Sequence, residues 1–215
     1  MRRSGLLLAC LLVSGSAAHP ADSGGIAPRA IDLLKLIEPA RDTVQGEWKL
    51  ERGALVCVRK LPWARLQIPY IPPDEYDLVV VAERQEGLEA INIGLVRGGT
   101  LFHVVLDGFA HKGLQSGLST LDGKWADANE TTVKGQLFTN GTPSMVVCSV
   151  REAGVKVTVD GREVIDWTGD YGRLGNIKPL EMPEPRALYI HSYQCRYRFS
   201  RYELRLVSGR GRPLR

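Results

Sequence analysis

The stretch from Val155 to Trp167, VKVTVDGREVIDW, constrains the fold of this chain more than any other segment. Apolar and polar residues alternate on both sides of the dipeptide Asp160-Gly161. An Asp-Gly pair readily adopts the positive φ angles of a tight turn whose twist matches two antiparallel strands. Alternation around such a turn is a strong short-range signal for a β-hairpin. The stretch therefore predicts two paired strands that share one apolar face.

The same alternation recurs along the chain and predicts an all-β fold. We expect roughly eleven or twelve strands with turn signals every roughly 8 to 12 residues, a spacing typical of an antiparallel sandwich or barrel. Three successive apolar runs, at 76–84, 88–96 and 100–106, are expected to form a meander. The chain has no repeat of fixed period, which argues against a propeller. Apolar residues at helical spacing predict one short helix over 30–39, ending at Pro39.

The N-terminus has the features of a secretory signal peptide. Arg2 and Arg3 precede an apolar run over 5–13, and small residues at 16–18 offer a cleavage site. The run is too short to cross a bilayer, so we expect a secreted, periplasmic or cell-envelope protein that does not span the membrane. The segment 7–10 also fits a bacterial lipoprotein box, which would place a lipid on Cys10.

These features divide the chain into four parts. Residues 1–18 are the predicted signal peptide, 19–29 a flexible segment, 30–207 a single sandwich domain, and 208–215 a basic disordered tail. Loss of Arg2 and Arg3 from the 28 Lys and Arg residues leaves 26 against 24 Asp and Glu residues. So small an excess does not predict nucleic-acid binding. No feature of the sequence predicts a particular protein partner.

The cysteines do not form a metal-binding pattern. Cys57, Cys148 and Cys195 remain after the signal peptide, without CxxC spacing or an adjacent histidine. One disulfide plus a thiol, or three buried thiols, are both compatible with the sequence. The loop residues Asp127, Asn129 and Glu130 carry oxygen atoms of the kind that calcium prefers. Such loop clusters are common, so we predict no metal and no cofactor, with calcium as the open alternative.

Polar side chains on several predicted strands point to one face of a sheet. In the strand 101–107, strict alternation places His103 and Asp107 on the face opposite Phe102. The same reasoning applied to the strands at 64–70, 88–96 and 187–193 yields a shared polar face. Its predicted members are Arg65, Gln67, Asn92, His103, Asp107, Tyr189, His191 and Tyr193.

This set suits a sugar, because polar groups in a largely apolar cleft fix a ligand's orientation. The alternative is a solvated sheet face with a few hydrogen-bonded buried groups. Trp63, Trp125 and Trp167 could add stacking platforms, although Trp48 and Trp167 fit the core better.

Several segments resemble the secreted bacterial 3-keto-disaccharide hydrolase family. They are Gly46-Glu47-Trp48, Gly53–Val56, Glu75–Leu78 and Leu188–His191, followed by the strand that contains Phe199. The resemblance covers 48–207 and implies a concanavalin A-like (laminin G-like) jelly-roll β-sandwich. In such folds glycans lie on the concave sheet.

The family's polar positions are only partly retained. His191 and Asp107 match, whereas Phe102 and Val104 replace a glutamate and a glutamine, and Tyr189 replaces a glutamine. The sequence also lacks a nucleophile elbow, a phosphate-binding glycine loop and HExxH.

The leading hypothesis is therefore non-catalytic binding of a glycan or glycoconjugate. The second is hydrolysis of a 3-keto-glycoside with His191 and Asp107 as acid and base. The third is a laminin G-like protein-interaction or envelope scaffold.

Overall fold

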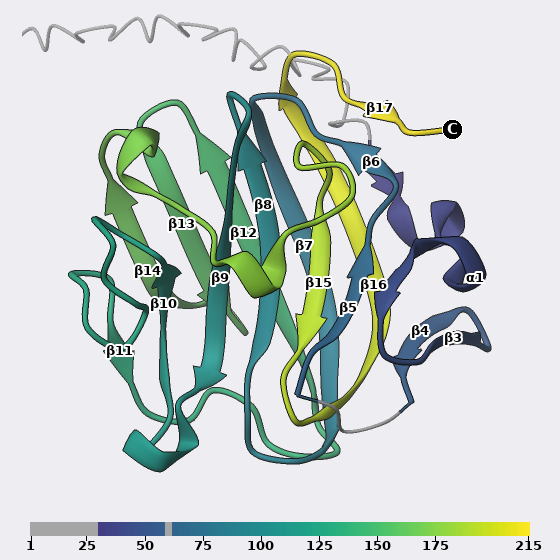
Figure 1. Cartoon of the computed structure of the whole chain (residues 1–215), viewed down its shortest axis with the longest axis horizontal. Helices are drawn as coiled ribbons and strands as arrows, with labels where there is room; N and C mark the ends of the chain where they lie inside the picture. Colours follow the sequence, from purple (N-terminus) through teal and green to yellow (C-terminus); the bar gives the residue numbers. More distant parts are fainter. Residues whose placement is uncertain (1–29, 59–61) are drawn as a thin grey trace, which may run out of the picture.

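The computed structural model describes residues 30–58 and 62–215. Their strands form two large antiparallel β-sheets packed face to face, and a separate two-stranded sheet (Figure 1). The all-β sandwich predicted from the sequence is confirmed. The predicted signal peptide, Cys10 and the segment 19–29 lie outside the described residues. No helix within the described ranges combines the length and the apolar character needed to cross a membrane.

One sheet has eight strands. Its order is β14 (Arg162–Thr168), β13 (Gly154–Val159), β12 (Pro143–Arg151), β7 (Glu75–Glu86), β16 (Arg196–Ser208), β4 (Ala54–Cys57) and β3 (Trp48–Glu51), with β1 (Ala30–Asp32) also paired to β16. The β13–β14 hairpin turns at Asp160 and Gly161, whose φ angles are 50° and 79°. The Asp-Gly turn therefore has the positive φ angles that the sequence predicts.

The second sheet has seven strands. Its order is β11 (Val133–Lys134), β10 (Gln115–Ser119), β9 (Thr100–Gly108), β8 (Ile91–Arg97), β15 (Tyr189–Ser192), β5 (Ala64–Gln67) and β2 (Thr43–Gln45). Strand β15 comes from late in the chain yet lies between β8 and β5 (Figure 1). The predicted meander is wrong in one respect: β8 and β9 pair with each other, but β7 belongs to the opposite sheet.

The core between the sheets is continuous and apolar. Alternate residues of each strand point into it, such as Ile91 and Ile93 from β8 and Phe102 and Val104 from β9. Cys57, Cys148 and Cys195 are also buried there. Burial raises the pKa of the Cys148 thiol to about 12, and the nearby charge of Asp77 adds to the shift.

The N-terminal part of the domain differs from the predicted helix over 30–39. Strand β1 comes first, followed by the 3-10 helix η1 (Leu33–Leu36) and the short helix α1 (Pro39–Asp42). Leu33 and Leu34 are buried, so the apolar spacing did mark residues that pack on the core. Pro39 begins a helix instead of ending one, because the first helical turn needs no donor at that position.

The predicted disordered tail is ordered in the structure. Strand β17 (Arg212–Pro213) pairs with β6 (Tyr70–Ile71), and the backbone N–H of Leu214 donates to the Pro69 carbonyl at 3.0 Å. The Arg215 guanidinium lies 2.8 Å from the Asp42 carboxylate. Backbone pairing and this ion pair hold a segment whose Gly and Pro content had suggested disorder.

Candidate functional site

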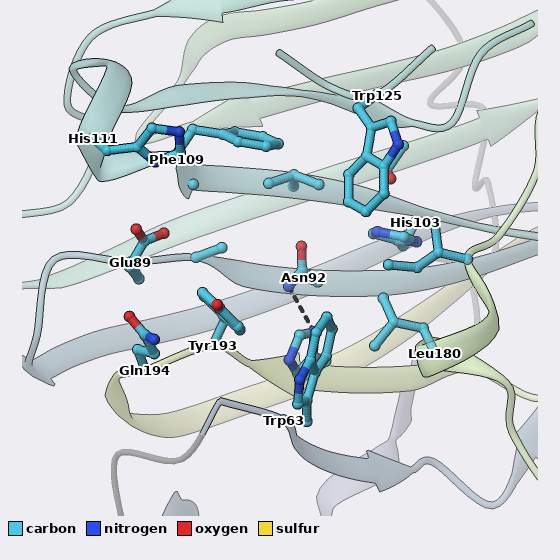
Figure 2. Close-up of a pocket in the computed structure, with 16 residues that line it drawn as sticks. Trp63, Glu89, Asn92, His103, Phe109, His111, Trp125, Leu180, Tyr193 and Gln194 are labelled. Atoms are coloured by element: carbon cyan, nitrogen blue, oxygen red, sulfur yellow. Dashed lines mark hydrogen bonds between the residues drawn. The ribbon is translucent and has the colours of Figure 1, made fainter. Parts of the chain in front are cut away.

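A cavity of about 460 Å³ opens on the outer face of the seven-stranded sheet (Figure 2). Its floor comes from the outward-facing residues of β8, β9 and β15, and its walls come from the surrounding loops. The lining residues are Trp63, Glu89, Ala90, Asn92, His103, Val105, Gly108, Phe109, His111, Ser119, Trp125, Ile177, Leu180, His191, Tyr193 and Gln194. Half of these residues are aromatic or aliphatic, and the polar groups Asn92, His103 and His191 lie in the floor.

Aromatic rings form much of the wall. In Figure 2, Trp63 and Trp125 lie on opposite sides of Asn92. Trp63 stacks on the His191 ring with centroids 5.2 Å apart and planes 13° apart, and it meets Tyr193 edge-on at 5.3 Å. Trp125 comes from the loop after β10 and is 48% exposed, which is unusual for so large an apolar side chain.

His191 and Asn92 form a buried pair in the cavity floor. The Nδ2 atom of Asn92 lies 2.7 Å from Nδ1 of His191. Burial lowers the pKa of His191 to about 3, and the neighbouring His103 acts in the same direction. The ring is therefore neutral at pH 7. Its Nε2 is buried, and a backbone hydrogen bond with Pro62 opposes the lowering of the pKa only in part.

His103 is held from the other side by a loop residue. Its Nδ1 lies 3.0 Å from the Oδ1 atom of Asn176, which also accepts a hydrogen bond from the Tyr189 hydroxyl at 3.2 Å. Burial lowers the pKa of His103 to about 4, against the opposing effect of the Asn176 hydrogen bond. This imidazole too is neutral at pH 7.

Asp107 does not belong to the cavity. Its φ angle of +53° breaks the strand alternation from which the shared face was inferred. Its carboxylate accepts hydrogen bonds from Arg84 Nη1 at 3.1 Å and from the backbone N–H groups of Leu137 and Phe138 at 2.7 and 3.0 Å. Arg84 and Asp107 are both fully buried. Burial raises the pKa of Asp107, while these hydrogen bonds and the Arg84 charge lower it.

The structure therefore does not join His191 and Asp107 as the predicted acid–base pair. Asp107 anchors the segment 137–138 through its backbone N–H groups, whereas His191 lies in the cavity floor.

Three more predicted site residues lie on the expected face but contact a covering segment, residues 176–184, instead of lining the cavity. Arg65 donates from Nη1 to the Glu181 carbonyl at 3.0 Å, and Gln67 Oε1 accepts from the Glu184 N–H at 2.9 Å. Tyr189 is fully buried and packs with Leu180 and Met182 of the same segment. These side chains hold the segment 176–184 against the sheet and do not line the cavity.

The cavity thus contains Asn92, His103, His191 and Tyr193 from the predicted set. The prediction omitted Glu89, Phe109 and Gln194, which lie in turns, and His111, which lies in the 3-10 helix η2 (Ala110–Lys112). No periodic pattern indicates a face there. Trp63 and Trp125 are the loop tryptophans for which the sequence suggests a stacking role, and both line the cavity. Trp167 is buried instead, and its Nε1 donates to Glu130 at 3.1 Å.

The loop considered for calcium uses its oxygen atoms internally. Asp127 pairs with Lys112, and the Asn129 amide donates to the Leu118 carbonyl at 2.7 Å. Glu130 accepts from Trp167 and pairs with Arg173. Within 30–58 and 62–215, no group of three or more His, Cys, Asp or Glu side chains is arranged to hold a metal ion.

Comparison with known proteins yields similarity in structure only. No protein-family model and no curated protein matches the sequence. A carbohydrate-binding module, CBM66 from Bacillus subtilis, is similar with a TM-score of 0.54 and 11% identity, over 76% of this chain and 94% of that one.

Two further solved structures share the architecture. The VIP36 exoplasmic/lumenal domain, bound to Ca²⁺ and Man3GlcNAc, has a TM-score of 0.55 and 10% identity over 81% of this chain and 89% of that one. The Crh5 transglycosylase in complex with NAG has a TM-score of 0.56 and 11% identity over 85% of each chain. At such identities the similarity concerns the fold: this chain is a β-sandwich of the architecture found in these carbohydrate-binding and transglycosylase proteins.

Proposed function

We propose that the cavity binds a neutral saccharide unit of a glycan or glycoconjugate, and that the protein binds this ligand without cleaving it. The observation that carries the proposal is the pairing of two indole walls, Trp63 and Trp125, with a floor of buried hydrogen-bonding groups. A pyranose ring offers apolar C–H faces for the walls and hydroxyl groups for the floor. The volume of about 460 Å³ lies within the range of small-ligand sites, about 300–1,000 Å³.

The hydrogen-bonding groups suit hydroxyl groups better than an ionic ligand. Burial keeps His103 and His191 neutral, so each ring offers one donor and one acceptor nitrogen. Asn92 adds an amide beside them. The names of the similar structures support a saccharide as the ligand class, since they include a carbohydrate-binding module and two proteins solved with sugars bound.

The carboxylates support binding without hydrolysis. Most glycosidases place two carboxyl groups on either side of the scissile bond, roughly 5 to 10 Å apart. Glu89 is the one carboxylate among the described residues of the lining, and its Oε1 accepts a hydrogen bond from the Ala110 N–H at 3.1 Å. Asp107 lies away from the cavity against Arg84. Hydrolysis of a 3-keto-glycoside by His191 and Asp107 therefore lacks a supporting contact.

We also propose that the protein acts outside the cytoplasm, on envelope or extracellular glycans. The support is the pattern of charge, apolar run and small residues over 1–18. Mass spectrometry of the protein secreted or fractionated from its own cells would test this. A mature N-terminus at His19 is expected, whereas a lipid-modified Cys10 or an uncleaved Met1 would contradict the predicted cleavage.

Calorimetric titration with cellobiose, maltose, laminaribiose, mannobiose and chitobiose tests the binding function. Sugar release is measured in the same samples and in parallel ones that contain a 3-keto-glucoside. We expect saturable binding of at least one disaccharide without release. Trp125→Ala should weaken binding by up to roughly tenfold, and Leu50→Ala should preserve it, since Leu50 is 41% exposed on β3 of the other sheet. Catalytic release, or an affinity that Trp125→Ala leaves unchanged, would refute the proposal.

A further inference from the structure

The orientation of one loop carboxamide, that of Asn176, is fixed by the backbone. Its Oδ1 accepts from the Ile177 N–H at 3.0 Å, and its Nδ2 donates to the Leu180 carbonyl at 2.9 Å. A backbone N–H can only donate and a carbonyl can only accept. Exchanging the amide oxygen and nitrogen would therefore break both bonds, so the atom that faces His103 is the oxygen.

This orientation determines which nitrogen of His103 carries the proton. Nδ1 lies 3.0 Å from Asn176 Oδ1, and an amide oxygen offers no proton, so Nδ1–H is the donor. A neutral imidazole with its proton on Nδ1 has a bare lone pair on Nε2. No hydrogen bond joins this Nε2 to any residue in the described ranges.

His103 lines the cavity at the end formed by Leu180 and Trp125 (Figure 2). Ser119 lies directly opposite His103 in the register of β10 and β9, and it lines the same cavity. Side chains opposite each other on one sheet face lie close together. This end of the cavity therefore places an acceptor nitrogen beside a serine hydroxyl, which can donate or accept.

We propose that His103 Nε2 accepts a hydrogen bond from a sugar hydroxyl, and that Asn176 is the positioning residue that sets this polarity. The inference rests on the proposed function and deepens it. The ligand must present a hydroxyl hydrogen at this end of the cavity, so a sugar that is deoxygenated or O-methylated there binds weakly.

Asn92 and His191 provide an internal contrast. The Nδ2 atom of Asn92 meets His191 Nδ1, but no backbone group anchors the Asn92 amide among the described residues. The Asn92 amide alone therefore does not fix the tautomer of His191, whereas Asn176, anchored by the backbone, fixes that of His103.

Long-range ¹H–¹⁵N NMR of the ¹⁵N-histidine-labelled protein at pH 7 tests the tautomer directly, without a ligand. The wild-type His103 signals should show a protonated Nδ1 and a bare Nε2. Asn176→Ala should weaken or reverse this preference. Tyr189→Phe is the matched control, because it removes a different bond to the same Oδ1 atom and should leave the His103 tautomer unchanged. A wild-type proton on Nε2 would overturn the inference.

Adding the same disaccharides at saturation tests the acceptor role. The His103 Nε2 signal should shift on binding, and Asn176→Ala should weaken binding at least roughly tenfold, the scale of one lost polar contact. Asn176→Asp places a carboxylate on the imidazole, which raises the pKa of His103. As the pH is lowered, protonation of His103 removes its acceptor, so this variant should lose binding at a higher pH than wild type does. Lost packing alone would not cause this shift.

An Nε2 signal that bound sugar leaves unmoved, or a wild-type pH profile in Asn176→Asp, would refute the acceptor role. Absence of binding in wild type would refute the proposed function itself. The tautomer of the unliganded protein would still decide the role of Asn176, so the two failures are distinguishable.

Discussion

The outer face of the seven-stranded sheet has two halves that carry similar polar residues but differ in what those residues contact. Asn92, His103 and His191 line an open cavity, whereas half-buried Arg65 and buried Gln67 hydrogen-bond to the segment 176–184. All project from strands of the same sheet, and several are neighbours in register: His191 pairs with Asn92 on one side and with Arg65 on the other. Strand alternation therefore does not separate the two halves.

The covering segment makes the difference. Its backbone accepts a hydrogen bond from Arg65 and donates one to Gln67. Its side chains Leu180 and Met182 are buried against Tyr189. The same segment supplies Asn176, which orients His103. The half that contains Arg65 and Gln67 thus holds in place a segment that forms one wall of the cavity.

The largest expected effect concerns Asp107, the predicted site residue that lies outside both halves. Arg84→Ala should destabilise the protein by about 3–5 kcal/mol, because it leaves a buried carboxylate without its charge partner. Urea denaturation measures the change. Lys156→Met, which removes exposed ion pairs on β13, should leave the midpoint almost unchanged. A small effect of Arg84→Ala would mean that Asp107 is not anchored as described.

Acid should lower the free energy of unfolding, because His103 and His191 are neutral in the folded protein and take up protons when it unfolds. The unfolded chain binds protons near pH 6.5, whereas burial lowers the pKa of His103 to about 4 and of His191 to about 3. Their stabilising contribution is complete above pH 6.5 and is lost as pH falls toward these lower values. We expect a loss of about 2 kcal/mol per histidine between pH 7.5 and 5.

Unfolding free energies measured across this pH range in wild type and His103→Asn test the histidine contribution. The variant keeps a neutral donor toward Asn176 but cannot be protonated, so its pH dependence should be shallower. Equal slopes in the two proteins would show that His103 is not the neutral, buried group inferred from the structure.

Gly94→Ala should lower the free energy of unfolding by displacing Tyr189, the residue that supports the segment 176–184. An added Cβ atom would lie 2.0 Å from Cδ1 of Tyr189, so the ring that supports the covering segment must move. Overpacking of this kind costs about 1–3 kcal/mol. Hydrogen exchange at the Glu184 amide, which donates to Gln67, should also accelerate.

A second substitution checks the cause. Tyr189→Leu in the Gly94→Ala background makes room for the methyl group, so the two changes together should destabilise less than the sum of the single changes. Simple additivity would mean that the Tyr189 ring is not what the new methyl group meets.

Trp125→Ala should have the smallest effect on folding and act on the cavity half alone. Trp125 is 48% exposed, so the free energy of unfolding should change by about 0.5 kcal/mol or less. A stacked aromatic contact contributes about 0.5–1.5 kcal/mol, so its loss should weaken disaccharide binding by up to roughly tenfold. Denaturation and calorimetry on the same preparation separate the two effects. A strong loss of stability would instead make Trp125 a structural residue.

Local sequence patterns predicted much of this arrangement. The Val155–Trp167 hairpin follows from alternation and an Asp-Gly turn, both of which depend on residues close together in the chain. The outward direction of Asn92, His103 and His191 follows from the same period, because their strand neighbours pack into the core. The alternation predicted the wrong direction for the Asp107 side chain, because a positive φ angle interrupts the regular strand there.

The chain by itself thus determined an antiparallel sandwich and the face on which its buried polar groups lie, since backbone alternation and turn chemistry are local properties. Tertiary structure alone decided that β7 joins the sheet opposite β8, and that β15 enters between β8 and β5. It also decided that the segment 176–184 hydrogen-bonds to Arg65 and Gln67, and that Asn176 determines which nitrogen of His103 carries the proton. These outcomes depend on contacts between residues distant in the chain, which compete for the same surface only once the two sheets have packed.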